Sequence, residues 1–269
     1  MALSVVDLYA KVLPKTNCRD CGFPTCIAFA GMVVSEMHPL KNCPHIPADV
    51  LAWAEPELAE QYAQGKWLKK DMAQEALTLA KERTADMALP DIAQRIGGTM
   101  DGPEMILPYF DSQVRITAEG EIRLPHREPT RNEQTFIHIH MAMGSSRNPT
   151  GNMKSFKEFP NTVSKVKSME SHVEAVLVHR FSGRPDELDR ICKAAGGSDL
   201  GADHPSPDRA YGFQVFPKIS VTLLFWDAHE DFDAEVKLLF DETIVEHLDI
   251  ECIMFLSEHL TQRLTEKLD

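Results

Sequence analysis

Four of the six cysteines are concentrated near the N-terminus, at Cys18, Cys21, Cys26 and Cys43. Their spacing, C-x2-C-x4-C-x16-C, groups the sulfur donors that hold zinc or an iron–sulfur cluster. Structural zinc sites usually pair two short C-x2-C knuckles, and this segment has one. Polar residues between the thiols disfavour four cysteines that are buried merely as small apolar side chains. The spacing therefore favours a [4Fe-4S] cluster, with zinc as the alternative.

The residues around the cysteines predict how the thiols are positioned. Gly22 and Pro24 favour a tight loop that can direct the first two thiols inward. Thr25 is suited to cap a helix that begins at the third cysteine, where the partial positive charge of the helix N-terminus stabilises a thiolate. The fourth cysteine follows this helix, and Pro44 restrains the chain directly after it.

The segment LPKTNCRDCGFPTCIAFAGMV…KNCPHI resembles the N-terminal cluster domain of the large subunit of the corrinoid iron–sulfur protein. The same small domain is similar to a module in some membrane-linked electron-transfer complexes. The resemblance covers about a sixth of the chain and includes Asn17, Thr25 and the proline after the fourth cysteine. It implies that all four cysteines ligate one [4Fe-4S] cluster. In the corrinoid proteins, this cluster passes a low-potential electron to cobalt.

Changes in composition predict three segments. Residues 1–47 form the cluster domain, residues 48–97 a helical linker rich in Ala, Glu, Lys and Leu, and residues 98–269 an α+β domain of unknown function. The predicted fold class is α+β, with a small helical four-cysteine domain followed by a mixed α+β domain. The first segment is short and has few large apolar side chains outside its helix, so we expect its folding to depend on the metal.

Hydrophobic patterns within residues 98–269 predict alternating helices and hairpins. The expected elements are strands within 105–110 and 113–124 with a turn at Glu119-Gly120, a helix over 162–180, a second helix from Pro185 to about 195, a hairpin over 213–227, and a helix or helix pair after 243. Residues 212–251 resemble the C-terminal half of an uncharacterised family. Its members join this cluster domain to a domain of unknown function and occur in anaerobes.

His138 and His140, in FIHIHM, would share one face of a strand, as H-x-H metal ligands do. On a helix the two side chains would diverge. The helix is favoured, because Asn132 can cap it and Phe136 and Ile139 fit its apolar face. The pair is therefore not expected to bind metal.

Other polar and thiol side chains are expected to have structural roles. The four remaining candidate ligands are His204 and His229, expected at the surface, and Cys192 and Cys252, expected in the core. Residues 154–160, KSFKEFP, could contact an anionic cofactor through their lysines. A loop anchored by Phe156 and Phe159 is favoured instead.

Whole-chain properties exclude several classes of protein. A formal net charge of −13 argues against a nucleic-acid-binding protein, because that affinity comes mostly from cations that contact phosphate. No apolar window is long enough for a membrane span, and the first residues lack the basic start of a secretory signal. A cytoplasmic location is therefore expected, where thiols stay reduced and available for metal.

We expect an iron–sulfur electron-transfer protein rather than a stand-alone enzyme, because the sequence has no phosphate loop, haem-attachment motif, catalytic triad or kinase signature. The resemblance implies a redox partner, such as a corrinoid protein or a methyltransferase, in anaerobic metabolism. One alternative is a carrier or chaperone whose second domain holds a corrinoid (cobalamin) or other tetrapyrrole next to the cluster. Another is an iron–sulfur sensor or assembly module.

Overall fold

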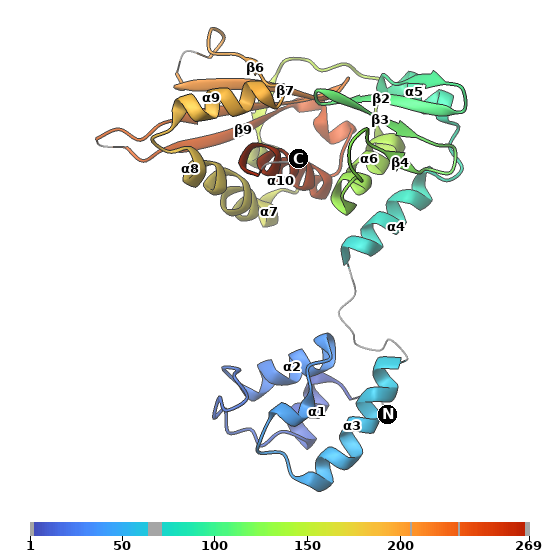
Figure 1. Ribbon diagram of the computed structural model, residues 1–269, viewed down its shortest axis with the longest axis vertical. Helices are drawn as coiled ribbons and strands as arrows, with labels where there is room; N and C mark the ends of the chain where they lie inside the picture. The colour runs from blue at the N-terminus through green and yellow to red at the C-terminus, as the bar shows by residue number, and fades with distance from the viewer. Residues whose placement is uncertain (1–2, 64–71, 205, 231, 267–269) are drawn as a thin grey trace. The chain divides into compact units, whose positions relative to one another are not determined.

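The computed structural model describes residues 3–63, 72–204, 206–230 and 232–266. The chain forms two compact units, Met1–Asp71 (unit 1) and Met72–Asp269 (unit 2), each with its own apolar core (Figure 1). Unit 1 is helical and unit 2 combines helices with two sheets, so the predicted α+β class is confirmed. Within the described residues, no helix is both long and apolar enough to cross a membrane.

Unit 1 is built from short helices around the cysteine segment. In chain order they are α1 (Val5–Lys11), α2 (Cys26–Glu36), the 3-10 turn η1 (Leu40–Asn42) and α3 (Ala48–Ala63). Leu8 of α1, Phe29 of α2 and Leu58 of α3 are buried in one core. The side chain of Gln61 fastens α3 to the chain start, because its Oε1 accepts from the backbone N–H of Leu3 at 2.7 Å. Unit 1 therefore has an apolar core that involves no metal, and α3 completes this core. The expectation that folding depends on the metal did not take this core into account.

The tract expected to be helical over 48–97 is divided between the two units, since α3 belongs to unit 1 and the helices after it to unit 2. The helices of unit 2 are α4 (Met72–Thr84), α5 (Leu89–Ile96), α6 (Arg131–Met143), α7 (Val163–Met169), α8 (Ala175–Phe181), α9 (Pro185–Ala194) and α10 (Ile250–Thr265), with the 3-10 turns η2 (Phe156–Glu158) and η4 (Glu242–Glu246). The single helix expected over 162–180 is instead α7 and α8 joined by a π-helical turn, η3 (Glu170–Glu174).

Two antiparallel sheets run through unit 2. The first has the order β1 (Thr99–Asp101), β2 (Glu104–Tyr109), β3 (Ser112–Ile116), β4 (Ile122–Arg123). The second has the order β5 (Met153–Ser155), β9 (Glu235–Asp241), β8 (Ile219–Trp226), β7 (Arg209–Phe216), β6 (Ser198–Asp199). The β7–β8 and β3–β4 pairs confirm the two hairpins predicted from sequence.

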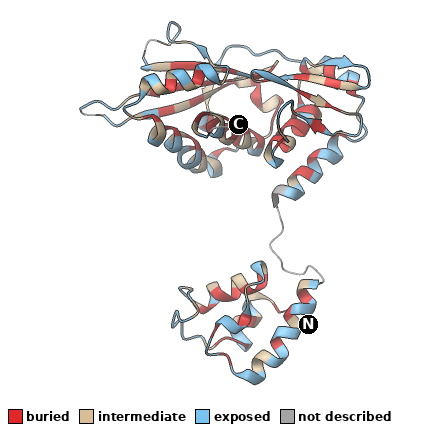
Figure 2. Ribbon diagram, viewed as in Figure 1, coloured by how far each residue is buried: buried red, intermediate tan, exposed pale blue. Residues whose placement is uncertain are grey.

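The sheets meet at the middle of unit 2, and helices α6, α7, α8 and α10 lie below them in the view of Figure 1. The backbone N–H of Phe110, just after β2, donates to the carbonyl of Val215 in β7 at 3.0 Å. Tyr109 packs against Phe216 there, with ring centroids 5.4 Å apart. Helix α10 lies against α6 and α8, and the buried residues follow the faces where helices and strands meet (Figure 2). Buried polar side chains of unit 2, among them His140 and Glu133, are described in the sections below.

Candidate metal centre

The first two cysteines lie in a loop with an unusual backbone. Asn17, Arg19 and Gly22 have left-handed conformations, with φ of 52°, 70° and 84°. A hydrogen bond from the backbone N–H of Gly22 to the carbonyl of Arg19, 2.8 Å long, closes the turn. Left-handed backbone is costly for residues with a Cβ and is kept where the surroundings fix it. In this loop Cys18 is exposed and Cys21 is half-buried.

The third cysteine begins a helix, as the sequence predicts. Cys26 is the first residue of α2, and the Thr25 side chain accepts from the backbone N–H of Ala28 at 3.2 Å. Asn17 adds a second tie, since its Oδ1 accepts from the backbone N–H of Cys26 at 2.8 Å. The Cys26 side chain is buried against the core of unit 1. The third thiol is therefore held at a helix N-terminus, where the backbone field favours negative charge.

The fourth cysteine follows the 3-10 turn η1. Cys43 is buried, at 4% exposure. Burial raises the pKa of its thiol, a hydrogen bond from the backbone N–H of His45 lowers it, and the charges of Cys21, Cys26 and Cys18 raise it again. A cation among the four sulfurs would reverse that repulsion and favour the thiolates.

The donor set fits iron–sulfur chemistry. Thiolates are the ligands that such clusters require, and the charge of each of the other three N-terminal thiols raises the pKa of Cys43. Cys26 and Cys43 are buried in the core of unit 1, whereas Cys18 lies at its surface. A centre held by this set would have one side against the protein and one side toward solvent.

Sequence reasoning did not identify a polar pair beside the thiols. His45 Nε2 lies 2.5 Å from Asp20 Oδ2. The ligand atoms of Cys18, Asp20 and His45 lie within 4.8 Å of one another, the one group of three candidate metal ligands found among the described residues. Hydrogen bonds from His45 and then Cys18 lower the pKa of Asp20. The pair ties the loop of the first two cysteines to the segment after Cys43. The only feature of the sequence that could have indicated this pair is that both residues lie close to cysteines.

The histidine pair of α6 does not form a joint site. His138 lies within hydrogen-bond distance of Thr84 Oγ1, at 2.9 Å, whereas His140 stacks on Phe216 with ring centroids 4.7 Å apart. His140 also faces His247, with ring centroids 5.5 Å apart. The helix predicted for this segment is therefore confirmed, and its two histidines point to different neighbours. The expected cap was wrong: Thr130 caps the helix, and Asn132 lies within its first turn.

Of the four other candidate ligands, three lie where they were expected, and His204 is less exposed than expected. His229 is exposed and His204 is half-buried, while Cys192 and Cys252 are buried in the core of unit 2. Burial raises the pKa of both core thiols, which keeps them protonated. Residues 154–160 are anchored by their aromatics, as predicted, since Phe156 and Phe159 are both buried. The strand β5 that begins this segment was not predicted.

Comparisons with known proteins separate the two parts of the chain. A family model described as "Putative Fe-S cluster" matches residues 13–45. The γ subunit of the acetyl-CoA decarbonylase/synthase complex of Methanocaldococcus jannaschii is 45% identical over 42 residues, which are 16% of this chain and 8% of that protein. The corrinoid/iron-sulfur protein large subunit of Moorella thermoacetica is 46% identical over 46 residues, 17% of this chain and 10% of that protein.

The chain thus spans a tenth or less of the length of these curated relatives. The predicted resemblance to the corrinoid iron–sulfur protein large subunit is confirmed over the N-terminal segment, and with it an iron–sulfur domain. No solved structure matches the chain. A second family model, described as "Domain of unknown function (DUF3786)", matches residues 88–263, which is most of unit 2. The chain therefore belongs to the DUF3786 family and carries an iron–sulfur cluster domain ahead of the domain that defines that family.

Proposed function

We propose that the chain is an electron-transfer protein that holds one [4Fe-4S] cluster on Cys18, Cys21, Cys26 and Cys43. The observation that carries this proposal is the match of residues 13–45, which hold all four thiols, to the family model described as "Putative Fe-S cluster"; two of these thiols are buried in the core of unit 1. When bound, such a cluster supplies a one-electron redox centre. The chain's own residues position the ligands: Thr25 caps the helix that begins at the third ligand, and Asn17 ties the cysteine loop to that helix.

The exposure of Cys18 supports exchange of electrons with another protein. Its loop lies at the surface, and the exposed side chains of Lys15 and Arg19 flank it. A docked partner could therefore approach this edge of the cluster directly. The names of the two curated relatives describe a corrinoid/iron-sulfur protein and a subunit of an acetyl-CoA decarbonylase/synthase complex. From these names we take corrinoid-dependent methyl transfer, or related anaerobic redox metabolism, as the setting, with a corrinoid protein or a methyltransferase as the partner.

The test is anaerobic reconstitution of the full chain with iron and sulfide. The expected product contains equal amounts of iron and acid-labile sulfide and gives a low-potential EPR signal after reduction with dithionite. Replacing any one of the four N-terminal cysteines by Ser should reduce the iron content and change the signal. Cys192→Ala and Cys252→Ala are the matched controls, because these thiols are buried in unit 2 and should leave both readouts unchanged.

Two results would count against the proposal. A colourless protein that takes up zinc on the same cysteines, with no EPR signal after reduction, would identify a structural metal site. Equal iron content in the N-terminal variants and the two controls would show that the four thiols are not the ligands. Mixing the same preparation with hydroxocobalamin, followed by desalting, tells whether the corrinoid is held by a partner or by this chain. Retained visible absorbance would place it on the chain itself.

A further inference from the structure

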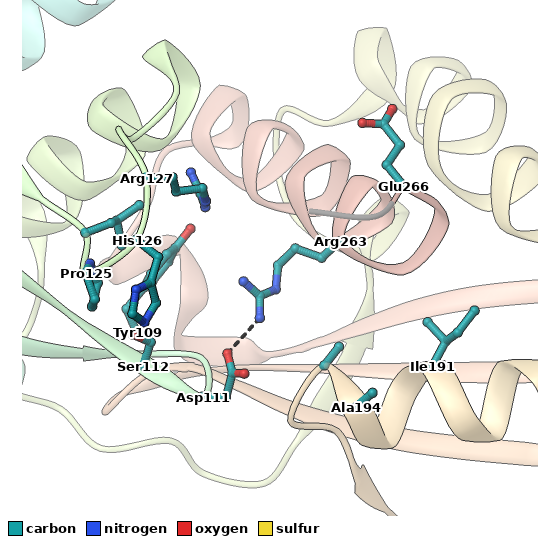
Figure 3. Close-up of a pocket in the computed structure, with 12 residues that line it drawn as sticks. Tyr109, Asp111, Ser112, Pro125, His126, Arg127, Ile191, Ala194, Arg263 and Glu266 are labelled. Carbon is teal, nitrogen blue, oxygen red and sulfur yellow. Dashed lines mark hydrogen bonds and ion pairs between the residues drawn. The ribbon is translucent and has the colours of Figure 1, made fainter. Parts of the chain in front are cut away.

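A cavity of about 470 Å³ opens in unit 2 between the segment after β4, helix α9 and the C-terminal end of α10 (Figure 3). Its volume lies within the range of roughly 300–1,000 Å³ that is usual for small-molecule sites. One part of its lining is apolar, with Leu124 and Ile191. Another part carries the guanidinium groups of Arg127 and Arg263, and Figure 3 shows that of Arg263 directed toward Asp111. The lining thus combines an apolar surface with fixed cationic groups.

Arg127 already forms an ion pair with Glu133. Its Nη1 and Nη2 atoms donate to the two carboxylate oxygens of Glu133, each at 2.6 Å, and Glu133 is completely buried. The Tyr109 hydroxyl and the backbone N–H of Thr130 also donate to this carboxylate, both at 2.8 Å. Burial raises the pKa of Glu133, but the hydrogen bonds from Arg127, the charge of His259 and the hydrogen bonds from Thr130 and Tyr109 outweigh it and bring the pKa down to about 2. Of these residues Arg127 and Tyr109 line the cavity, and their shared partner Glu133 also has His259 Nε2 3.2 Å from its Oε1.

Arg263 is held less completely. One nitrogen, Nη2, donates to Asp111 Oδ1 at 2.7 Å, and the guanidinium lies over the Phe110 ring, 4.5 Å from its centroid. Its Nε is buried and has no acceptor among the described residues. Asp111 is about half exposed, at 48%, while Arg263 is 16% exposed. An ion pair to an exposed carboxylate contributes only about 0–1 kcal/mol, so a better acceptor could replace Asp111.

The shape and charge of this arrangement select the ligand. A guanidinium presents a planar fork of donors that matches a carboxylate with two parallel hydrogen bonds. A phosphate dianion fits less well, because Asp111 and Glu266 line the same cavity and the charge of Arg127 is already neutralised. We propose that unit 2 binds a small organic monocarboxylate through Arg263, with the apolar body of the acid against Leu124 and Ile191. This site belongs to the DUF3786 domain and does not depend on the cluster.

The proposal predicts opposite effects for two substitutions in one ion pair. Acetate, butyrate, benzoate and phenylacetate are titrated calorimetrically into the full chain, alongside neutral benzamide and inorganic phosphate. Benzoate and phenylacetate should bind saturably, and benzamide about tenfold more weakly, because it lacks the charge that Arg263 pairs with. Arg263→Gln should weaken benzoate about tenfold or more. Asp111→Asn should strengthen it, because the competing carboxylate is removed.

Arg123→Gln is the matched control. It removes the same charge from an exposed arginine of unit 2 that pairs with Glu104 and Glu121 and does not line the cavity, and it should leave binding unchanged. Thermal unfolding of each variant checks that the fold is kept. If Arg263→Gln does not fold, the effect of Asp111→Asn on benzoate binding decides the proposal. The proposal is overturned if no acid binds saturably, if benzamide or phosphate binds as tightly as benzoate, or if Asp111→Asn weakens binding.

Discussion

The side-chain oxygen of Asn17 accepts a hydrogen bond from the backbone N–H of Cys26, 2.8 Å away. This contact joins the loop that carries the first two cysteines to the helix that carries the third. Asn17 itself has a left-handed backbone, with φ of 52°, which asparagine tolerates better than most residues. One side chain thus fixes both the path of the loop and its distance from α2.

Replacing Asn17 by Ala should make the cluster easier to lose. The substitution removes one acceptor at the helix start and puts a less tolerant residue in the left-handed position, together worth about 1–2 kcal/mol. The expected result is a several-fold faster loss of visible absorbance and iron when the reconstituted protein is exposed to air. Asn17→Asp keeps an acceptor at this position and should restore most of the lifetime. Equal decay of the Ala variant and the parent would show that the contact does not hold the site.

Removing the proposed cluster ligand at the start of α2 should expose unit 1 locally. We expect Cys26→Ala to leave the cysteine loop and the segment around Cys43 sensitive to protease, because metal binding stabilises the fold of such small modules. Helices α1, α2 and α3 share an apolar core, so the cuts should concentrate in the loops between them. Unit 2 has a separate core and should survive.

Limited proteolysis followed by mass spectrometry of the fragments makes this measurement. Cys192→Ala is the control, since it removes a thiol from unit 2 and should leave unit 1 as resistant as in the parent. Chelation of iron from the parent protein should reproduce the pattern of Cys26→Ala. A resistant N-terminal segment in both cases would mean that the apolar core alone holds unit 1 together.

The positions of the cysteines could be predicted from the sequence because the residues that set them lie close together in the chain. The thiol spacing, the cap at Thr25 and the turn residue Gly22 all act over a few positions, and the structure places the cap and the turn as expected. The hairpin β7–β8 was predictable for the same reason, since its β-branched and aromatic run is continuous. Periodicity also identified helix between 162 and 180, but nothing local signalled the π-helical turn within it.

The cavity in unit 2 had no comparable signal. Asp111 and Arg263 are 152 positions apart, and only the packing of α10 near the end of β2 brings them together. Arg127 and Glu133 are close in sequence, yet nothing in the sequence indicates that the carboxylate is completely buried. Such sites depend on how distant elements meet, which hydrophobic patterns do not specify. The Asp20–His45 pair was missed for the same reason, although both residues lie close to the cysteines.

Removing Arg127 should destabilise unit 2 strongly. In Arg127→Met the buried Glu133 carboxylate loses both of its guanidinium hydrogen bonds, and breaking a buried ion pair from one side costs about 3–5 kcal/mol. The measurement is urea unfolding of unit 2 at neutral pH. Arg123→Met, which breaks an exposed pair, should cost less than about 1 kcal/mol. Adding Glu133→Gln to Arg127→Met should recover part of the loss, and no recovery would mean that the unpaired charge is not its cause.

Acid should destabilise unit 2 well before its carboxylates are protonated. Burial, with a smaller effect of the charge on His247, lowers the pKa of His140 to about 3, and burial lowers the pKa values of His138 and His259 to about 4. Near pH 5 the unfolded chain binds protons on these histidines that the folded chain does not, because the unfolded pKa is about 6.5. Their full stabilising effect is therefore present above about pH 6.5 and is lost as the pH falls toward 4. At pH 5, each of these histidines lowers the free energy of unfolding by about 2 kcal/mol relative to its value above pH 6.5.

Substitution of one buried histidine tests this directly. In His140→Gln the free energy of unfolding should fall less steeply between pH 6 and 4, by about 1.4 kcal/mol per pH unit, the slope for one proton. The absolute stability of this variant is not the readout, since the new side chain also changes packing against Phe216. His126→Gln, which removes an exposed histidine, is the control variant. If His140→Gln and His126→Gln have the same slope, the proton uptake on unfolding does not come from His140.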